Sequence, residues 1–221
     1  KIYEDARDLY KAATVYHQLG IVAQQQRQFE QAEQYYFKAL KIKEDAGDFY
    51  NAASEYHQLG NVAYQQRQFE QAEQYYFKAL KIKEDAGDFY SAANVYHQLG
   101  MVAEKQQQFE DAISYYQKAF GIYEQFQDWY KASQTLAKWA RVLEAQSNFS
   151  EALPIYIRGF VIDIEHHQEF IRWYVDALAR MLRVSGENQF DTIWREVTGE
   201  EGAGEVRKAI WAARDRFDKE G

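Results

Sequence analysis

Proline and cysteine are nearly missing from this sequence of 221 residues, which contains one proline and no cysteine. Proline interrupts a helix at a cost of about 3 kcal/mol, so its near absence favours a chain that is helical almost throughout. The lack of cysteine excludes disulfides and thiolate metal sites, and it is compatible with a reducing compartment. We therefore expect an all-α protein located in the cytoplasm.

Long apolar runs and an excess of positive charge are also missing. No segment approaches the roughly 18 apolar residues of a membrane span, and no signal peptide is visible. The net charge of −8 disfavours nucleic acid and anionic membranes as partners, because both attract basic surfaces. Apolar residues make up 47% of the chain, a fraction typical of a domain with a packed core.

What the sequence does contain is a repeat of 40 residues. The motif Tyr-His-Gln-Leu-Gly occurs at Tyr16–Gly20, Tyr56–Gly60 and Tyr96–Gly100, and the 26 residues Gln25–Tyr50 recur unchanged at Gln65–Tyr90. A fixed period of about 20 to 50 residues is typical of solenoids, propellers and arrays. The chain is therefore predicted to be a repeat protein.

Each repeat is predicted to contain two helices. Apolar and small residues follow one another at steps of three and four along 13–23 and again along 29–40, which is helical spacing. Gly47 suits the left-handed residue that ends the second helix, and Asp48 suits the N-cap of the next one. Neither helix can bury its apolar stripe alone, so the hairpins must stack on one another.

This pattern resembles the tetratricopeptide repeat (TPR) family. The matching positions of the first repeat are Tyr16, Leu19, Gly20, Ala23, Ala32, Tyr36 and Ala39. The period of 40 exceeds the family's usual period of about 34, and the family's proline is absent at Glu44, so the chain is most similar to the long-helix repeats of Pins-type scaffolds, kinesin light chains and bacterial multidomain regulators. The resemblance implies an all-α, right-handed α-solenoid of TPR hairpins with a C-terminal capping helix.

The repeat also divides the chain into predicted segments. They are the end of a preceding repeat at 1–7, TPRs at 8–47, 48–87, 88–127 and 128–167, a degenerate TPR-like hairpin at 168–200 and a capping helix at 201–221. Because residues 1–7 match the end of a second helix, we expect a fragment of a longer protein. Two interpretations of the C-terminal part stay open: a cap with a polar outer face, or a docking surface that uses Trp194 and Trp211.

The first two complete repeats differ at only six positions, all in the first helix. The pairs are Leu9/Phe49, Lys11/Asn51, Thr14/Ser54, Val15/Glu55, Ile21/Asn61 and Gln24/Tyr64. At 100° per residue, this variation is predicted to lie on the half of the helix opposite the apolar stripe. Drift of exposed positions is one explanation, and alteration of a binding surface is another. The exposed face of the second helix does not vary at all, which favours the second explanation.

The TPR resemblance implies that the first helices line a concave groove and that these positions point into it. The predicted ligand-binding residues are Thr14, His17, Ile21, Gln24, Ser54, His57, Asn61, Tyr64, Asn94, His97, Met101, Glu104 and Arg141. Three of them form a ladder of one histidine per repeat. Helix axes lie about 8–10 Å apart, too far for one ion that needs nitrogens at about 2.1 Å, so we interpret the ladder as polar groove lining and expect no metal.

No motif for catalysis accompanies the repeats. The segment 199–204 lacks the lysine of a phosphate-binding loop, serine nucleophile motifs are absent, and no two carboxylates are paired in a pocket. We therefore expect no cofactor and no enzymatic activity. The predicted function is a non-catalytic scaffold that holds a protein or peptide in the groove. The alternatives are a structural array that self-associates end to end, and the sensor arm of a multidomain signalling protein.

Overall fold

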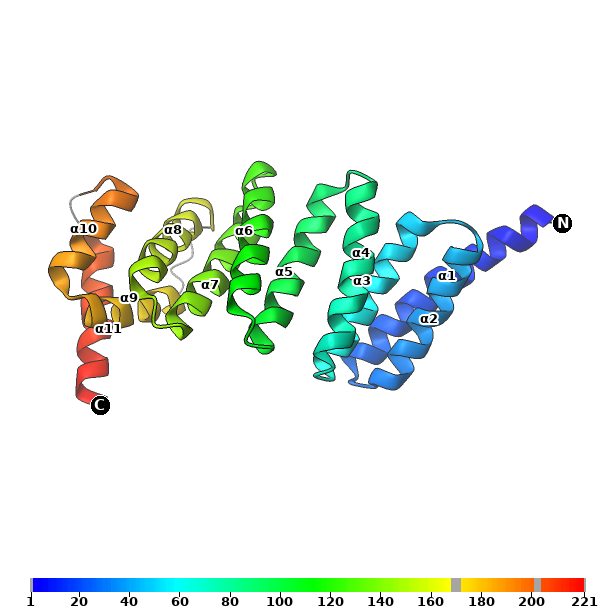
Figure 1. Cartoon of the computed structure of the whole chain (residues 1–221), viewed down its shortest axis with the longest axis horizontal. Helices are drawn as coiled ribbons and strands as arrows, with labels where there is room; N and C mark the ends of the chain where they lie inside the picture. The colour runs from blue at the N-terminus through cyan, green and yellow to red at the C-terminus, as the bar shows by residue number, and fades with distance from the viewer. Residues whose placement is uncertain (1, 168–171, 201–203, 221) are drawn as a thin grey trace. The chain divides into compact units, whose positions relative to one another are not determined.

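The computed structural model describes residues 2–167, 172–200 and 204–220, and this part of the chain is helical, with no strand (Figure 1). Its helices are α1 (Ile2–Gln25), α2 (Phe29–Asp45), α3 (Phe49–Gln65), α4 (Phe69–Asp85), α5 (Phe89–Lys105), α6 (Phe109–Gln125), α7 (Trp129–Ala145), α8 (Phe149–His167), α9 (Arg172–Ser185), α10 (Glu187–Thr198) and α11 (Gly204–Glu220). None of these described helices combines the length and the apolar character needed to cross a membrane. The predicted all-α class, with helices in successive hairpins, is confirmed.

Tight turns with a left-handed residue join successive helices from α1 to α8. After α2, Gly47 has φ 71°, and its amide donates to the carbonyl of Glu44 at 2.9 Å. The amide of Asp48 donates to the carbonyl of Lys43 at 2.8 Å, which completes a Schellman ending. The predicted glycine at this helix end is confirmed. After α1 the same role falls to Arg27 at φ 58°, a conformation that its β carbon disfavours.

Aspartate side chains cap the first helices of successive hairpins. The carboxylate of Asp48 accepts a hydrogen bond from the amide of Asn51 at 3.2 Å, and that of Asp88 accepts one from the amide of Ser91 at 3.1 Å. Each bond satisfies one of the amides that have no partner inside the first turn of a helix. The N-cap predicted at Asp48 is therefore confirmed.

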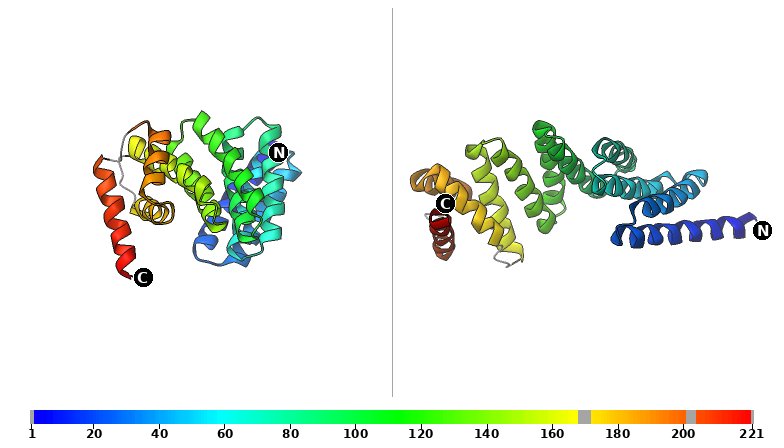
Figure 2. Two further views of the ribbon diagram at one scale, coloured as in Figure 1. Left: turned by 60° about the vertical axis from the view of Figure 1, so that its left-hand side comes forward. Right: turned by 90° about the horizontal axis from the view of Figure 1, so that it is seen from below.

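The chain forms two compact units, residues 1–106 and residues 107–221. In the first unit α1 lies against α2, and α3 against α4 (Figure 2). The buried side chains of one core cluster are Ala23, Ala32, Tyr36, Leu40, Ala52, Leu59 and Val62. A β carbon at Gly20 would lie 2.5 Å from Cε1 of Tyr36, and one at Gly60 would lie 2.5 Å from Cε1 of Tyr76. Glycine at these positions lets the tyrosine ring of the second helix contact the backbone of the first.

In the second unit α7 lies against α8, and α9 packs against both α8 and α11. Trp194 of α10 is 4% exposed, with its ring centroid 6.2 Å from that of Phe160 and 6.0 Å from that of Phe190. Trp211 is half-buried, and its indole N–H donates to Glu187 at 3.2 Å. Trp194 is thus a core residue, which removes the interpretation of this part of the chain as a docking surface that uses Trp194.

Both segments predicted at the C-terminal end of the sequence are helical where the structure describes them. The segment predicted as a hairpin at 168–200 contains α9 (Arg172–Ser185) and α10 (Glu187–Thr198), and residues 168–171 lie outside the described part. The terminal helix is α11, and residues 201–203 and 221 of the predicted capping segment also lie outside it.

Candidate ligand-binding surface

Twelve of the thirteen predicted binding residues lie on α1, α3 and α5 of the first unit. On each helix four of them occur at steps of three, four and three residues, so they share one face. They are Thr14, His17, Ile21 and Gln24 on α1, Ser54, His57, Asn61 and Tyr64 on α3, and Asn94, His97, Met101 and Glu104 on α5. We call these twelve side chains the first-helix surface. Thr14 is exposed and the other eleven are half-buried. Arg141 is exposed on α7 of the second unit.

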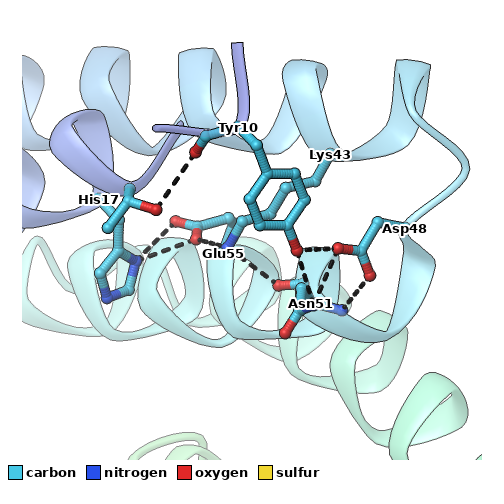
Figure 3. A network of polar contacts seen from close by, with 7 residues as sticks. Tyr10, His17, Lys43, Asp48, Asn51 and Glu55 are labelled. Atoms are coloured by element: carbon cyan, nitrogen blue, oxygen red, sulfur yellow. Dashed lines mark hydrogen bonds and ion pairs between the residues drawn. The ribbon is translucent and has the colours of Figure 1, made fainter. Parts of the chain in front are cut away.

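A buried charge network joins α1, α2 and α3 beside this surface (Figure 3). The side chain of Glu55 is 0% exposed. Nδ1 of His17 lies 2.9 and 3.0 Å from the two carboxylate oxygens of Glu55, and Nζ of Lys43 donates to Oε1 of Glu55 at 2.6 Å. A buried carboxylate is costly unless it is paired and hydrogen-bonded, and here two partners meet that need. His17 is therefore engaged between the first and second hairpins.

The corresponding contact between α4 and α5 has no such acid. Val95, which is 3% exposed, stands 40 residues after Glu55. Nζ of Lys83 instead lies 3.3 Å from Oδ2 of Asp88 and 3.7 Å from the ring centroid of Tyr50. Burial alone would raise the pKa of Asp88, but hydrogen bonds from Ser91, and then from Tyr50 and Lys83, lower that pKa to about 2. Lys43 thus pairs with Glu55, whereas its counterpart Lys83 pairs with Asp88.

The histidine of the second repeat shows the consequence. Nε2 of His57 is buried and has no hydrogen-bond partner among the described residues. Burial, followed by the charge of Lys83, lowers the pKa of His57 to about 4. His17 and His57 therefore have different environments although their immediate sequence is the same, because Glu55 faces the first of them.

The prediction that the repeat differences all lie on the half of the helix opposite the buried stripe is wrong for Glu55. Its counterpart Val15 on α1 is 56% exposed, whereas Glu55 and Val95 are buried. A helical wheel considers one helix alone. In the stacked protein α2 covers the face of α3 that carries Glu55, and α4 covers the face of α5 that carries Val95. This position belongs to the contact between hairpins.

Two further differences between the repeats are coupled through a buried tyrosine. The hydroxyl of Tyr36 donates to Oε1 of Gln24 at 2.9 Å. In the second repeat Tyr64 replaces Gln24, and the hydroxyl of Tyr76 donates instead to Oδ1 of Asn61 at 2.7 Å. A buried hydroxyl needs a partner, so an amide is retained but moves by one turn of the helix. Part of the variation therefore has a structural cause.

The side-chain groups on the first-helix surface suit noncovalent binding. It includes hydroxyl, amide and imidazole groups, the thioether of Met101, and the ring of Tyr64, which contacts Phe69 at 5.8 Å between centroids. In the described residues no three histidine, aspartate or glutamate side chains are grouped so that they could hold a metal ion. Aromatic and methionine side chains are favoured at protein interfaces.

Comparison with known families matches residues 1–175 to the soluble NSF attachment proteins (SNAP), a family of TPR-like helical repeats. No curated protein matches the sequence.

Solved structures of TPR proteins share the fold. The apo form of RapI is 14% identical with a TM-score of 0.69, over 95% of this chain and 85% of RapI. A Podosopora anserina protein of nearly identical TPR-like repeats, described as a candidate kinesin light chain, is 15% identical with a TM-score of 0.68, over 93% of this chain and 96% of its own. YrrB is 17% identical with a TM-score of 0.58, over 97% of this chain and 98% of YrrB. The TPR resemblance is confirmed.

Proposed function

Since this chain belongs to the soluble NSF attachment protein (SNAP) family, we propose that it is a non-catalytic scaffold that binds a protein or peptide segment on its first-helix surface. The observation that carries the proposal is that all twelve residues of this surface keep at least part of their side chains accessible on one face of α1, α3 and α5. YrrB, described as a TPR protein with an unusual peptide-binding site, supports a peptide as the ligand class. We place the scaffold in the cytoplasm because the chain contains no cysteine.

Tyr64 is the side chain expected to contribute most to affinity. It is half-exposed, and its ring is oriented by the contact with Phe69, so little conformational freedom is lost when a ligand covers it. Asn61 is less suitable for a test, because it accepts the hydrogen bond of the buried Tyr76 hydroxyl. Its removal would change stability as well as binding.

The test begins with selection of peptides from a random library on the immobilised protein. Their affinities for the wild type, for Tyr64→Ala and for the control Gln74→Ala are then compared by fluorescence anisotropy. Gln74 is exposed on α4, outside the first-helix surface. We expect Tyr64→Ala to weaken binding by about tenfold, the scale of an interface hot spot, and Gln74→Ala to leave it unchanged. Selected peptides that bind all three proteins equally would refute binding at this surface.

A second candidate function, association with another copy of the chain, is favoured by an apolar face on α1. Val15, Leu19 and Val22 are 56%, 39% and 49% exposed. Their counterparts on α3 that are apolar, Leu59 and Val62, are each 1% exposed. The preceding hairpin covers those positions on α3, and an end-to-end contact with a second copy of the chain would cover the α1 positions in the same way.

Light scattering separates this second candidate from a purely monomeric scaffold. If the α1 face pairs, the mass should rise with concentration towards that of a dimer, and Leu19→Glu should return it to the monomer value. A mass that stays monomeric across the concentration series would rule out this association.

A further inference from the structure

A cavity of about 420 Å³ lies on the side of the first unit that presents the second helices. Its lining residues are Phe37, Leu40, Lys41, Glu44, Asp45, Tyr56, Tyr75 and Lys78, from α2, α3 and α4. None of them belongs to the first-helix surface or to the six positions at which the repeats differ. The volume lies within the range of about 300–1,000 Å³ that is usual for ligand pockets.

Aromatic rings form the apolar walls of this cavity. The ring of Tyr75 lies edge-on to that of Phe37, at 6.3 Å between centroids, and 6.5 Å from that of Tyr56. Tyr36 and Leu40 form the buried face of α2, whereas Phe37 on the same helix is 41% exposed. Such walls suit a large apolar or aromatic side chain. An aromatic ring gains most binding free energy when it contacts other rings edge-on or offset.

Some of the charged side chains around the cavity form ion pairs with described residues and others do not. Lys41 pairs with Asp45 at 3.1 Å, and Glu44 accepts the hydroxyl of Tyr56 at 2.6 Å. Lys78 lies 5.1 Å from the ring centroid of Tyr56 and, within the described residues, makes no ion pair. The cavity therefore offers the Lys78 ammonium on α4, which lacks a carboxylate in the described part of the chain, and the Glu44 carboxylate on α2, which is held by the Tyr56 hydroxyl. A ligand with an acidic group beside its apolar part would complement the Lys78 ammonium.

The same side chains recur in the next repeat. All eight lining residues have identical counterparts 40 residues later in the sequence, and the six of these on α4 and α5 are Phe77, Leu80, Lys81, Glu84, Asp85 and Tyr96. Phe77 is 41% exposed, as Phe37 is, and the hydroxyl of Tyr96 donates to Glu84 as that of Tyr56 does to Glu44. Phe37 contacts Tyr75 and still leaves 41% of its surface exposed, so part of its ring is available to a ligand.

We propose that this cavity is a second binding site, which takes a peptide segment with one large apolar or aromatic side chain next to a carboxylate. The apolar side chain enters between Phe37 and Tyr75, and the carboxylate pairs with Lys78. The site lies apart from the first-helix surface, so its existence does not depend on the function proposed for that surface.

The test uses two small probes, N-acetyl-tryptophyl-glutamate amide and its neutral match N-acetyl-tryptophyl-glutamine amide. Binding is followed by NMR through the backbone amide shifts of residues on α2 and α4. We expect saturable shifts around the cavity, with the acidic probe binding about threefold more tightly, the scale of one partly exposed ion pair. Lys78→Met should remove this preference, and Phe37→Ser should weaken both probes.

Lys38→Met is the matched control, because Lys38 lies 5.4 Å from the ring centroid of Tyr16 and does not line the cavity. It should leave the preference for the acidic probe intact. Phe37 and Lys78 are exposed, so circular dichroism should show unchanged helicity in their variants. The proposal is overturned if the shifts around the cavity do not saturate, if they occur only on the first-helix surface, or if Lys78→Met keeps the preference.

Discussion

Replacing Lys43 with methionine isolates the energetic role of the buried charge network. Methionine keeps most of the length of the lysine side chain but removes the ammonium group that donates to Glu55 at 2.6 Å. The Glu55 carboxylate is 0% exposed and cannot turn to water, so only His17 would remain as its partner. Loss of one member of a buried ion pair typically costs about 3–5 kcal/mol, because the other charge stays buried.

Lys83→Met is a matched control within the same chain. Lys43 and Lys83 occupy identical helices, and the side chain of each is 11% exposed. Lys83, however, pairs with the 21% exposed side chain of Asp88 and lies over the ring of Tyr50. A partly exposed ion pair contributes about 0–1 kcal/mol and a cation–π contact about 0.5–1 kcal/mol, so its loss should cost about 1–2 kcal/mol.

The assay is urea unfolding followed by circular dichroism, with hydrogen exchange of the α2 and α3 amides to locate the effect. Lys43→Met should lower the free energy of unfolding by about 2 kcal/mol more than Lys83→Met. Adding Glu55→Val to Lys43→Met should restore most of the loss, because valine already fits the equivalent buried position at Val95. Equal costs for the two lysine variants, or no recovery in the double variant, would refute this account of Glu55.

Two further predictions concern His57 and the close contacts of glycine. Because the pKa of His57 is lowered to about 4 from an ordinary 6.5, the unfolded chain binds this proton more readily than the folded one between these values. The contribution of His57 to the free energy of unfolding should therefore fall as the pH drops from about 6.5 to about 4, as measured by urea unfolding at a series of pH values. Val95→Glu should raise the pKa of His57 in an NMR titration. A His57 that titrates near 6.5 in the wild type contradicts the lowered pKa. Gly60→Ala should lower the unfolding free energy by about 1–3 kcal/mol, because its β carbon would lie 2.5 Å from the Tyr76 ring. Gly121→Ala on α6, where a β carbon meets nothing within 4 Å, should raise it by about 0.5–1 kcal/mol, and equal effects would contradict the role of the close approach.

Variation between near-identical repeats has two kinds of cause in this protein. Glu55 answers Lys43 and His17 across a contact between hairpins, and Asn61 takes over the hydrogen bond that Gln24 makes in the first repeat. Such substitutions maintain the fold. Thr14 lies exposed on the first-helix surface, with no comparable partner in the core, and positions of this kind are the ones that a ligand can select.

The sequence by itself determined the helices, the turns and their succession. The steps of three and four residues, the left-handed Gly47 and the capping Asp48 act within one or two turns of the chain, so local physical rules suffice to predict them. The TPR pattern identified Gly20 and Tyr36 as a small and an aromatic position, and the structure shows that the two are in close contact.

Only the tertiary structure decided which neighbouring helix covers each face. Glu55 and Val15 are equivalent in the sequence, yet Glu55 is fully buried, because α2 packs against α3, whereas Val15 is 56% exposed. The aromatic cavity likewise depends on side chains from three helices up to 41 residues apart. Burial and electrostatics depend on the whole environment of a side chain, and a periodic pattern along one helix does not contain that information.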